Sequence, residues 1–240
     1  MGKDIKKISV VLPAYNEKDN LENAVIKIRN FLEKLKIPYE IIIVEDGSTD
    51  GTDKIAEALS KRYLNVIYIH SKKRLGKGKA ISRGFSRASG SILLFMDCDL
   101  STDLTHIEDI IREIESGSDI VVGSRLLSNS NVRRSLKREI LSRIYNFLVR
   151  LILRSKIRDH QCGFKAFKRE IILDLLNYVE DNHLFWDTEI LVIAQRKKYK
   201  IKEIPVRWYE GKTTKVKFRD SFIMFIKILQ LRFRLFFDKL

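Results

Sequence analysis

The chain has 240 residues, of which 45% are hydrophobic, and a formal net charge of +15 from 46 basic and 31 acidic residues. This length suffices for a large buried core in one or two domains, and the composition argues against wholesale disorder. The two cysteines, Cys98 and Cys162, make a disulfide framework improbable and fit a reducing cytoplasm. No uncharged apolar run approaches the roughly 20 residues that span a bilayer, and the polar start lacks the apolar core of a signal peptide. We therefore expect a soluble or peripheral protein.

The positive charge is concentrated in the second half of the chain. Residues 125–169 carry 13 basic and 2 acidic side chains, and residues 197–240 carry 13 basic and 4 acidic ones, so the remainder is mildly acidic. Such a surplus points to an anionic partner. Charge alone leaves nucleic acid, a phospholipid surface and a phosphorylated substrate open.

Strand and helix patterns alternate along the first half. Strands are predicted at residues 8–12, 39–44, 66–70, 92–96 and 119–123, and helices at 21–35, 52–62, 79–90 and 104–116. This order predicts a doubly wound, mostly parallel sheet, in which ligands bind beyond the carboxyl ends of the strands. Four polar loops follow these strand ends, at residues 13–17, 45–50, 70–79 and 97–103.

Two aspartates directly follow the apolar run 92–96. Asp97 and Asp99 are one residue apart, and alternation along a strand would send both side chains to the same side. Two such carboxylates repel each other unless a cation lies between them, and Mg²⁺ and Mn²⁺ prefer carboxylate oxygens. The alternative is a turn with two solvated acids, but the neighbouring polar loops favour a metal site.

The second half is helical and basic, with a loop predicted at residues 158–165 and a strand at 201–208. Residues 136–154 keep apolar side chains on one face with arginines at its margin, and residues 218–240 are apolar almost all round, broken by basic side chains. We expect a catalytic domain over residues 1–217 and a basic amphipathic helix over 218–240. Both helices suit a membrane interface. The alternative for helix 136–154 is that its apolar face packs on the sheet or in a dimer. The alternative for helix 218–240 is that it packs against a partner chain.

Three sequence blocks, residues 11–17, 44–52 and 97–99, together resemble the inverting family 2 of nucleotide-sugar glycosyltransferases, which has the GT-A fold. Residues 123–125, 158–165 and 186–189 resemble the dolichyl-phosphate glucosyltransferases, with dolichyl-phosphate mannose synthases as close relatives. The resemblance covers nearly the whole chain.

The resemblance implies a donor nucleotide at the first two blocks. The residues implied are Pro13, Ala14, Tyr15, Glu17 and Asp46. The side chains suit this role, because a nucleobase needs a ring to stack on and one or two hydrogen-bond acceptors. Tyr15 packing in the core and Asp46 capping a helix are the alternatives.

The resemblance also places Mg²⁺ or Mn²⁺ at Asp97 and Asp99. Negative charge grows on a departing nucleoside diphosphate, and a divalent ion at this position would stabilise that transition state. Lys77, in a glycine-containing loop, is predicted to reach the donor phosphates.

A polyprenyl phosphate is a dianion on an apolar tail, so its binding requires basic side chains near the metal. The candidates are Arg125, Arg133, Arg134, Arg138 and Lys165, with Arg125 and Arg133 preferred. A phosphate whose second ionisation lies near pH 6 needs no strong general base. Trp186, Asp187 and Glu189 are expected to contact acceptor or sugar. The expected catalytic residues are Asp97, Asp99, Arg125 and Asp187.

The sequence thus predicts transfer of one hexose, with inversion, from a nucleotide sugar to dolichyl or polyprenyl phosphate by a peripheral protein on the cytoplasmic face of the membrane. UDP-glucose is the first donor expected and GDP-mannose, as in the mannose synthases, the second; a homo-oligomer is open. A soluble GT-A transferase with a saccharide acceptor is one alternative. A basic nucleic-acid-binding protein is another, but it leaves the acidic loops unexplained and no nucleic-acid motif is present.

Overall fold

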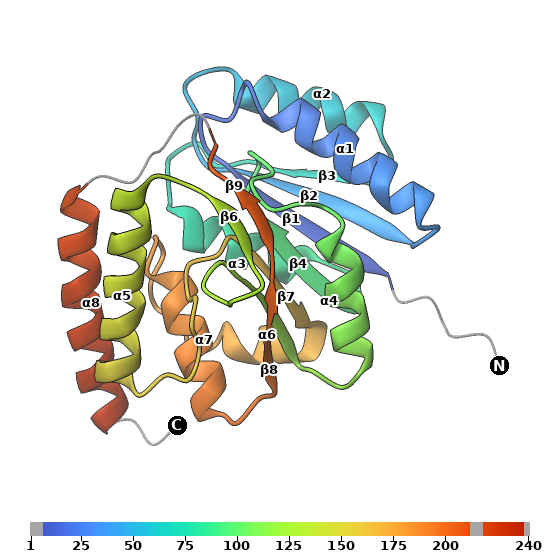
Figure 1. Ribbon diagram of the computed structural model, residues 1–240. Helices are drawn as coiled ribbons and strands as arrows, with labels where there is room; N and C mark the ends of the chain where they lie inside the picture. The colour runs from blue at the N-terminus through green and yellow to red at the C-terminus, as the bar shows by residue number, and fades with distance from the viewer. Residues whose placement is uncertain (1–6, 212–217, 238–240) are drawn as a thin grey trace.

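A seven-stranded sheet forms the centre of the computed structural model, which describes residues 7–211 and 218–237 (Figure 1). The strand order is β3-β2-β1-β4-β7-β5-β8, and only β7 runs antiparallel to its neighbours. The strands are β1 Ile8–Ala14, β2 Tyr39–Glu45, β3 Val66–Ile69, β4 Ile92–Met96, β5 Ile120–Ser124, β7 Phe164–Lys168 and β8 Ile201–Pro205. The predicted mostly parallel, doubly wound sheet is confirmed.

Helices cover both faces of the sheet (Figure 1). One layer consists of α1 Leu21–Lys34, α2 Thr52–Arg62 and α4 His106–Glu115, and the other of α3 Lys77–Arg87, α6 Arg169–Leu175 and α7 Trp186–Arg196. Alternation along β1 divides its side chains between the two cores: Val10 and Leu12 enter the first, and Val11 enters the second. The parallel strands β1, β2 and β4 are apolar over most of their length because both faces of the sheet are covered.

Two long helices, α5 Leu136–Leu153 and α8 Phe218–Phe237, lie side by side next to the sheet (Figure 1). Val149 of α5, Ile228 of α8 and Val192 of α7 belong to one buried cluster that attaches the pair to the body. Large apolar side chains on both helices remain exposed. This α5–α8 apolar face comprises Leu136, Ile140, Leu141, Ile144, Phe147 and Leu151 of α5 and Phe222, Ile223, Phe225, Ile226, Leu229, Phe233, Phe236 and Phe237 of α8.

Within the described part of the chain, no helix combines the length and the apolar character that crossing a bilayer requires. The last three residues of the predicted 218–240 helix lie outside the described residues, as do residues 1–6 and 212–217 of the predicted domain.

Two features differ from the sequence prediction. The segment expected to be a loop, residues 158–165, ends in β7, and the single strand expected at 201–208 divides into β8 and β9 Arg207–Tyr209. Pro205 ends β8 because proline has no N–H for the ladder. The strand β9 instead pairs with β6 Asn131–Arg133 in a separate two-stranded sheet. Because β7 is antiparallel, its first residues lie at the same edge as the carboxyl ends of β4 and β5.

Candidate active site

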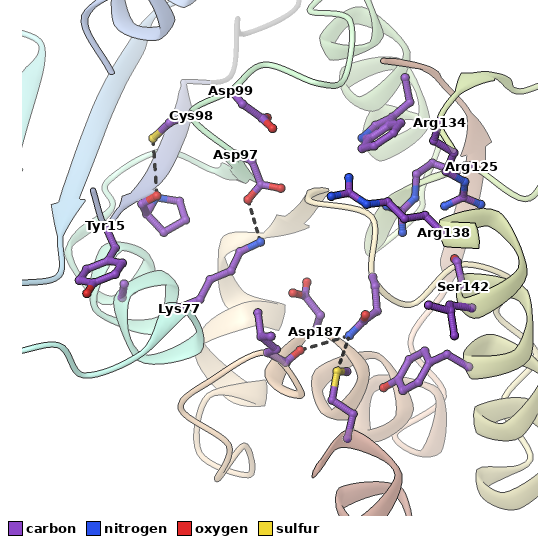
Figure 2. A pocket seen from close by; sticks show the side chains of 18 of the residues that line it. Tyr15, Lys77, Asp97, Cys98, Asp99, Arg125, Arg134, Arg138, Ser142 and Asp187 are labelled. Carbon is purple, nitrogen blue, oxygen red and sulfur yellow. Dashed lines mark hydrogen bonds and ion pairs between the residues drawn. The ribbon is translucent and has the colours of Figure 1, made fainter. Parts of the chain in front are cut away.

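A cavity of about 730 Å³ lies at this edge of the sheet. Twelve of the residues predicted from sequence line it: Pro13, Ala14, Tyr15, Glu17, Asp46, Lys77, Asp97, Asp99, Arg125, Arg134, Arg138 and Asp187. Figure 2 shows Tyr15 and Lys77 on one side of this space and the three arginines on the other. We call the part around Tyr15, Asp46, Lys77, Asp97 and Asp99 the acidic end, and the part along α5 and α8 the basic end.

The loops of the acidic end are fixed to one another by hydrogen bonds. Asn16 bridges the first two, because its backbone N–H donates to Ser48 Oγ (3.0 Å) and its side-chain oxygen accepts from the N–H of Thr49 (2.9 Å). The backbone N–H of Glu17 donates to Thr52 Oγ1 (2.9 Å). The positions of Tyr15 and Glu17 are therefore set by the loop that follows β2.

Asp46 holds the loop before α3. Its two carboxylate oxygens accept the backbone N–H groups of Leu75 and Gly76, each at 2.8 Å. Asp46 does not cap α2, whose N-cap residue is Gly51. Arg74, which the sequence analysis missed, places its guanidinium carbon 4.0 Å from the centroid of the Tyr15 ring. The sequence shows a basic loop at this position, but nothing in it singles out Arg74 as the residue that contacts Tyr15.

The two aspartates after β4 have different partners. Asp97 Oδ1 lies 2.7 Å from Lys77 Nζ, whereas Asp99 accepts from the backbone N–H (3.0 Å) and the hydroxyl (2.7 Å) of Ser101. The turn between them and Ser101 is made by Leu100, with a φ of 50°. Partial burial opposes the charge on Lys77, but the carboxylates of Asp97 and Asp187 hold its pKa above the usual range.

Each carboxylate of this pair lies against a glycine. A Cβ on Gly163 would overlap the Asp97 carboxylate, and one on Gly211 would lie 2.7 Å from Asp99 Oδ2. Two hard carboxylates at one edge of a cavity are suitable ligands for Mg²⁺ or Mn²⁺. Among residues 7–211 and 218–237, no group of three or more His, Cys, Asp and Glu side chains is arranged to hold a metal. The pair therefore suits an ion that takes its remaining oxygens from a bound ligand and water.

Two buried ion pairs each contribute one residue, Arg125 or Asp187, to the cavity lining. Arg125 donates from Nε and Nη2 to the two oxygens of Asp159 (2.8 and 2.9 Å). Burial alone would raise the pKa of Asp159, but Arg125 holds it well below its usual range. Lys165 Nζ, which is fully buried, donates to Asp187 Oδ1 (2.5 Å) and to the carbonyl oxygen of Cys162 (2.6 Å). Lys165 thereby orients the carboxylate that Asp187 presents to the cavity.

One face of α5 builds the basic end. Arg138, Ser142 and Tyr145 line the cavity, and their spacing is that of successive turns of a helix. Ser142 and Tyr145 were missed, although this spacing was available in the sequence. The arginines at this end are paired with carboxylates: Arg134 with Glu139 (2.5 Å) and Arg138 with Glu210. The adjoining wall is apolar and consists of Leu141, Ile144, Leu148, Leu184, Met224, Phe225 and Ile228.

Four predicted site residues lie outside the cavity lining: Arg133, Lys165, Trp186 and Glu189. Arg133 is exposed on β6, and Trp186 is buried in the core, where its indole N–H donates to Ser82 Oγ (3.0 Å). Glu189 is buried against α8, with Oε1 2.6 Å from Arg234 Nη2. Direct contact of these four with a substrate stays a prediction.

Comparison with curated proteins gives relatives with named activities. The chain is 46% identical over 213 residues to glycosyltransferase AglD of Haloferax volcanii, covering 87% of this chain and 34% of that protein. It is 33% identical to dolichyl-phosphate beta-glucosyltransferase ALG5D of Trichomonas vaginalis (93% and 72% covered) and 34% identical to the Saccharomyces cerevisiae dolichyl-phosphate beta-glucosyltransferase (85% and 67%). The chain thus spans about a third of the first relative and about 70% of the other two.

Solved structures show the same fold. Glucosyl-3-phosphoglycerate synthase from Mycobacterium tuberculosis, in complex with Mn²⁺, UDP and phosphoglyceric acid, superposes with a TM-score of 0.69 at 20% identity, covering 94% of this chain and 77% of that one. The fold is therefore GT-A. A complex of the same synthase with Mg²⁺ and UDP gives a TM-score of 0.68.

The model of the family described as "Glycosyl transferase family 2" matches residues 9–176, which include β1 to β5, β7 and the acid pair. These matches agree with the cavity at the carboxyl ends of the strands and with the predicted resemblance. The chain belongs to glycosyl transferase family 2 and is a glycosyltransferase.

Proposed function

We propose that this glycosyltransferase moves glucose from UDP-glucose to dolichyl or another polyprenyl phosphate, with inversion at the sugar carbon. The observation that carries the proposal is the chemistry of one cavity, which joins two aspartates at its acidic end to arginines and an apolar wall at its basic end. Relatives with 31–36% identity are named dolichyl-phosphate beta-glucosyltransferases, which supports this acceptor and this sugar.

The acidic end would hold the donor. Tyr15 offers a ring to the nucleobase, and Lys77 offers a cation to the diphosphate. A Mg²⁺ or Mn²⁺ ion held by Asp97 and Asp99 would supply positive charge where the leaving diphosphate gains negative charge. Asp187, fixed by Lys165, would accept a hydrogen bond from a sugar hydroxyl and so orient the ring.

The basic end would hold the acceptor. Its phosphate would contact Arg134, Arg138 and Ser142, and the isoprene units next to it would lie along the apolar wall that includes Ile144 and Met224. One phosphate oxygen attacks the anomeric carbon of glucose from the face opposite UDP, and the bond to UDP breaks. Because a phosphate monoester is largely dianionic at neutral pH, its attack needs no proton transfer to a protein base.

The α5–α8 apolar face would rest on the membrane, where the acceptor resides. Exposed Arg143 and Arg150 lie on the same helix as six exposed apolar side chains, and each basic residue near an anionic surface contributes about 1 kcal/mol. Both cysteines are buried, and neither lies in a disulfide among the described residues, which supports a reducing compartment and hence the cytoplasmic face. A second copy of the chain is the alternative occupant of this face.

The test is a transfer assay with a panel of nucleotide sugars, dolichyl phosphate and Mg²⁺ or Mn²⁺. We expect glucosyl transfer from UDP-glucose and a weaker rate, or none, from GDP-mannose. Mannose transfer alone would replace the proposal by a mannose synthase activity. Transfer only to a saccharide, or no transfer from any donor, would refute the lipid acceptor.

A further inference from the structure

A short loop, residues 180–183, lies between α8 and the acidic end of the cavity. Two basic residues of α8 form ion pairs with this loop or with α7, the helix that follows it in the chain. Arg234 Nη2 lies 2.6 Å from Glu189 Oε1 on α7, and Arg234 Nη1 lies 2.7 Å from Glu180 Oε2. Lys227 Nζ lies 3.2 Å from Asp181 Oδ2. The terminal helix is thus joined by charge to a loop of the catalytic body.

Glu189 connects Arg234 to the backbone of this loop. Its Oε2 accepts the N–H groups of Asp181 (2.8 Å) and Glu180 (3.2 Å), while its Oε1 faces Arg234. The carboxylate is 3% exposed, and a buried carboxylate requires both hydrogen bonds and an opposite charge. Removal of Arg234 would leave Glu189 without its nearest cation and so loosen the loop that it holds.

The other side of the loop contacts the start of α3. The carbonyl oxygen of Asn182 accepts the backbone N–H of Lys79 (3.0 Å). Asn182 and the His183 ring also lie so close to Gly76 that no Cβ would fit there, and Gly76 has a φ of 111°, which disfavours any other residue. The residue after this glycine is Lys77, which pairs with Asp97.

We propose that Arg234, acting through Glu189 and the 180–183 loop, is a positioning residue for Lys77. The packing of α8 against this loop and α7 then sets the affinity of the acidic end for a nucleoside diphosphate. This inference rests on the proposed function, because it takes Lys77 as a ligand of the donor diphosphate. The same helix supplies Met224 and Ile228 to the apolar wall of the basic end. One element therefore contacts the lipid side of the cavity directly and its nucleotide side through the loop.

The experiment measures the affinity of the full chain for UDP in the presence of Mg²⁺, by calorimetry or NMR titration. We expect Arg234→Gln to weaken UDP binding about fivefold, the lower end of typical couplings between sites. Lys227→Gln, which removes an exposed partner of Asp181, should act in the same direction by a smaller factor and is a second variant should Arg234→Gln fail to fold. The control, Arg232→Gln, removes the same charge two residues away and should change affinity less than twofold.

The same substitution in a Lys77→Met chain distinguishes an effect that passes through Lys77 from a general loss of structure. If the effect of Arg234 passes through Lys77, then Arg234→Gln should weaken UDP binding less than twofold in a Lys77→Met chain. An equal loss in both backgrounds, or wild-type affinity in Arg234→Gln and Lys227→Gln, would overturn the inference. A wild-type chain that binds no UDP would refute the proposed function itself, and the inference with it.

Discussion

The two ends of the cavity are built in different ways. At the acidic end, side-chain oxygens of Asn16 and Asp46 bind backbone N–H groups of neighbouring loops, so the backbone itself fixes the site. At the basic end, the buried side chain of Arg134 and the partly exposed one of Arg138 are each paired with one partly exposed carboxylate, beside apolar side chains that remain uncovered. The comparison suggests a preformed site for a small rigid nucleotide and an exchangeable one for a lipid phosphate.

The largest expected effect is the loss of either aspartate at the acidic end. Asp97→Asn and Asp99→Asn should each lower glucosyl transfer by about a thousandfold, because charge stabilisation of the leaving group is lost. The rate is measured in a transfer assay at saturating Mg²⁺. Asp103→Asn, in the same segment but outside the cavity lining, is the matched control. Ordinary activity of Asp99→Asn would show that a metal is not held there.

The next effect is at the basic end. Arg138→Gln should lower kcat/KM for dolichyl phosphate about 10- to 100-fold, as expected for a lost charge-assisted hydrogen bond, and leave the affinity for UDP unchanged. Arg112→Gln removes an exposed charge from α4, outside both the cavity lining and the α5–α8 apolar face, and should change kcat/KM little. Weakened UDP binding in Arg138→Gln would contradict the separation of the two ends.

A smaller effect on the reaction is expected at the α5–α8 apolar face. The double variant Phe233→Glu, Phe236→Glu should reduce partition onto anionic vesicles about tenfold or more, because two exposed rings no longer enter the interface. Flotation measures this, and transfer to a short, water-soluble isoprenoid phosphate should be unaffected. Leu64→Glu changes a fully exposed residue between α2 and β3, outside this face, and serves as control. Unchanged flotation, with a shift from dimer to monomer, would assign the face to a second copy.

The smallest effect on the reaction is expected at the other edge of the sheet. Glu40 binds Lys7, Ser9 and Ser89, and although burial alone would raise its pKa, these bonds lower it to about 2. The stabilisation is therefore fully present above about pH 4.5 and is lost as the pH falls towards 2. Glu40→Gln should lower the free energy of unfolding by about 2 kcal/mol at pH 7 and by only about 0.5 kcal/mol at pH 2.5, with UDP affinity unchanged. Denaturant unfolding at both pH values measures this; a difference that is as large at pH 2.5 as at pH 7 would contradict it.

The sequence predicted the acidic end better than the basic end, for a physical reason. Parallel strands bring successive loops to one edge, so chain order alone placed residues 13–17, 45–50 and 97–103 together. The basic end depends on contacts between elements far apart in sequence. Arg134 and Arg138 were predicted, but the wall formed by Met224 and Ile228 depends on how α8 packs on α5.

Burial of Lys165 and Glu189 could not be read from the sequence. The resemblance proposed both as substrate-binding residues, and their contact with a substrate stays a prediction. In the structure Lys165 pairs with Asp187, and Glu189 pairs with Arg234. The lysines of β7 also obscured the strand, because a buried charge breaks the apolar pattern by which strands are found.

The apolar wall of the cavity is short, because it spans only from Leu141 to Leu148 on α5, about two turns of helix. If the acceptor binds as proposed, the protein contacts only the few carbons nearest the phosphate, and the rest of the isoprenoid tail stays in the bilayer. The reaction should then depend little on the number of isoprene units, so lipids of very different length should be glycosylated at similar rates.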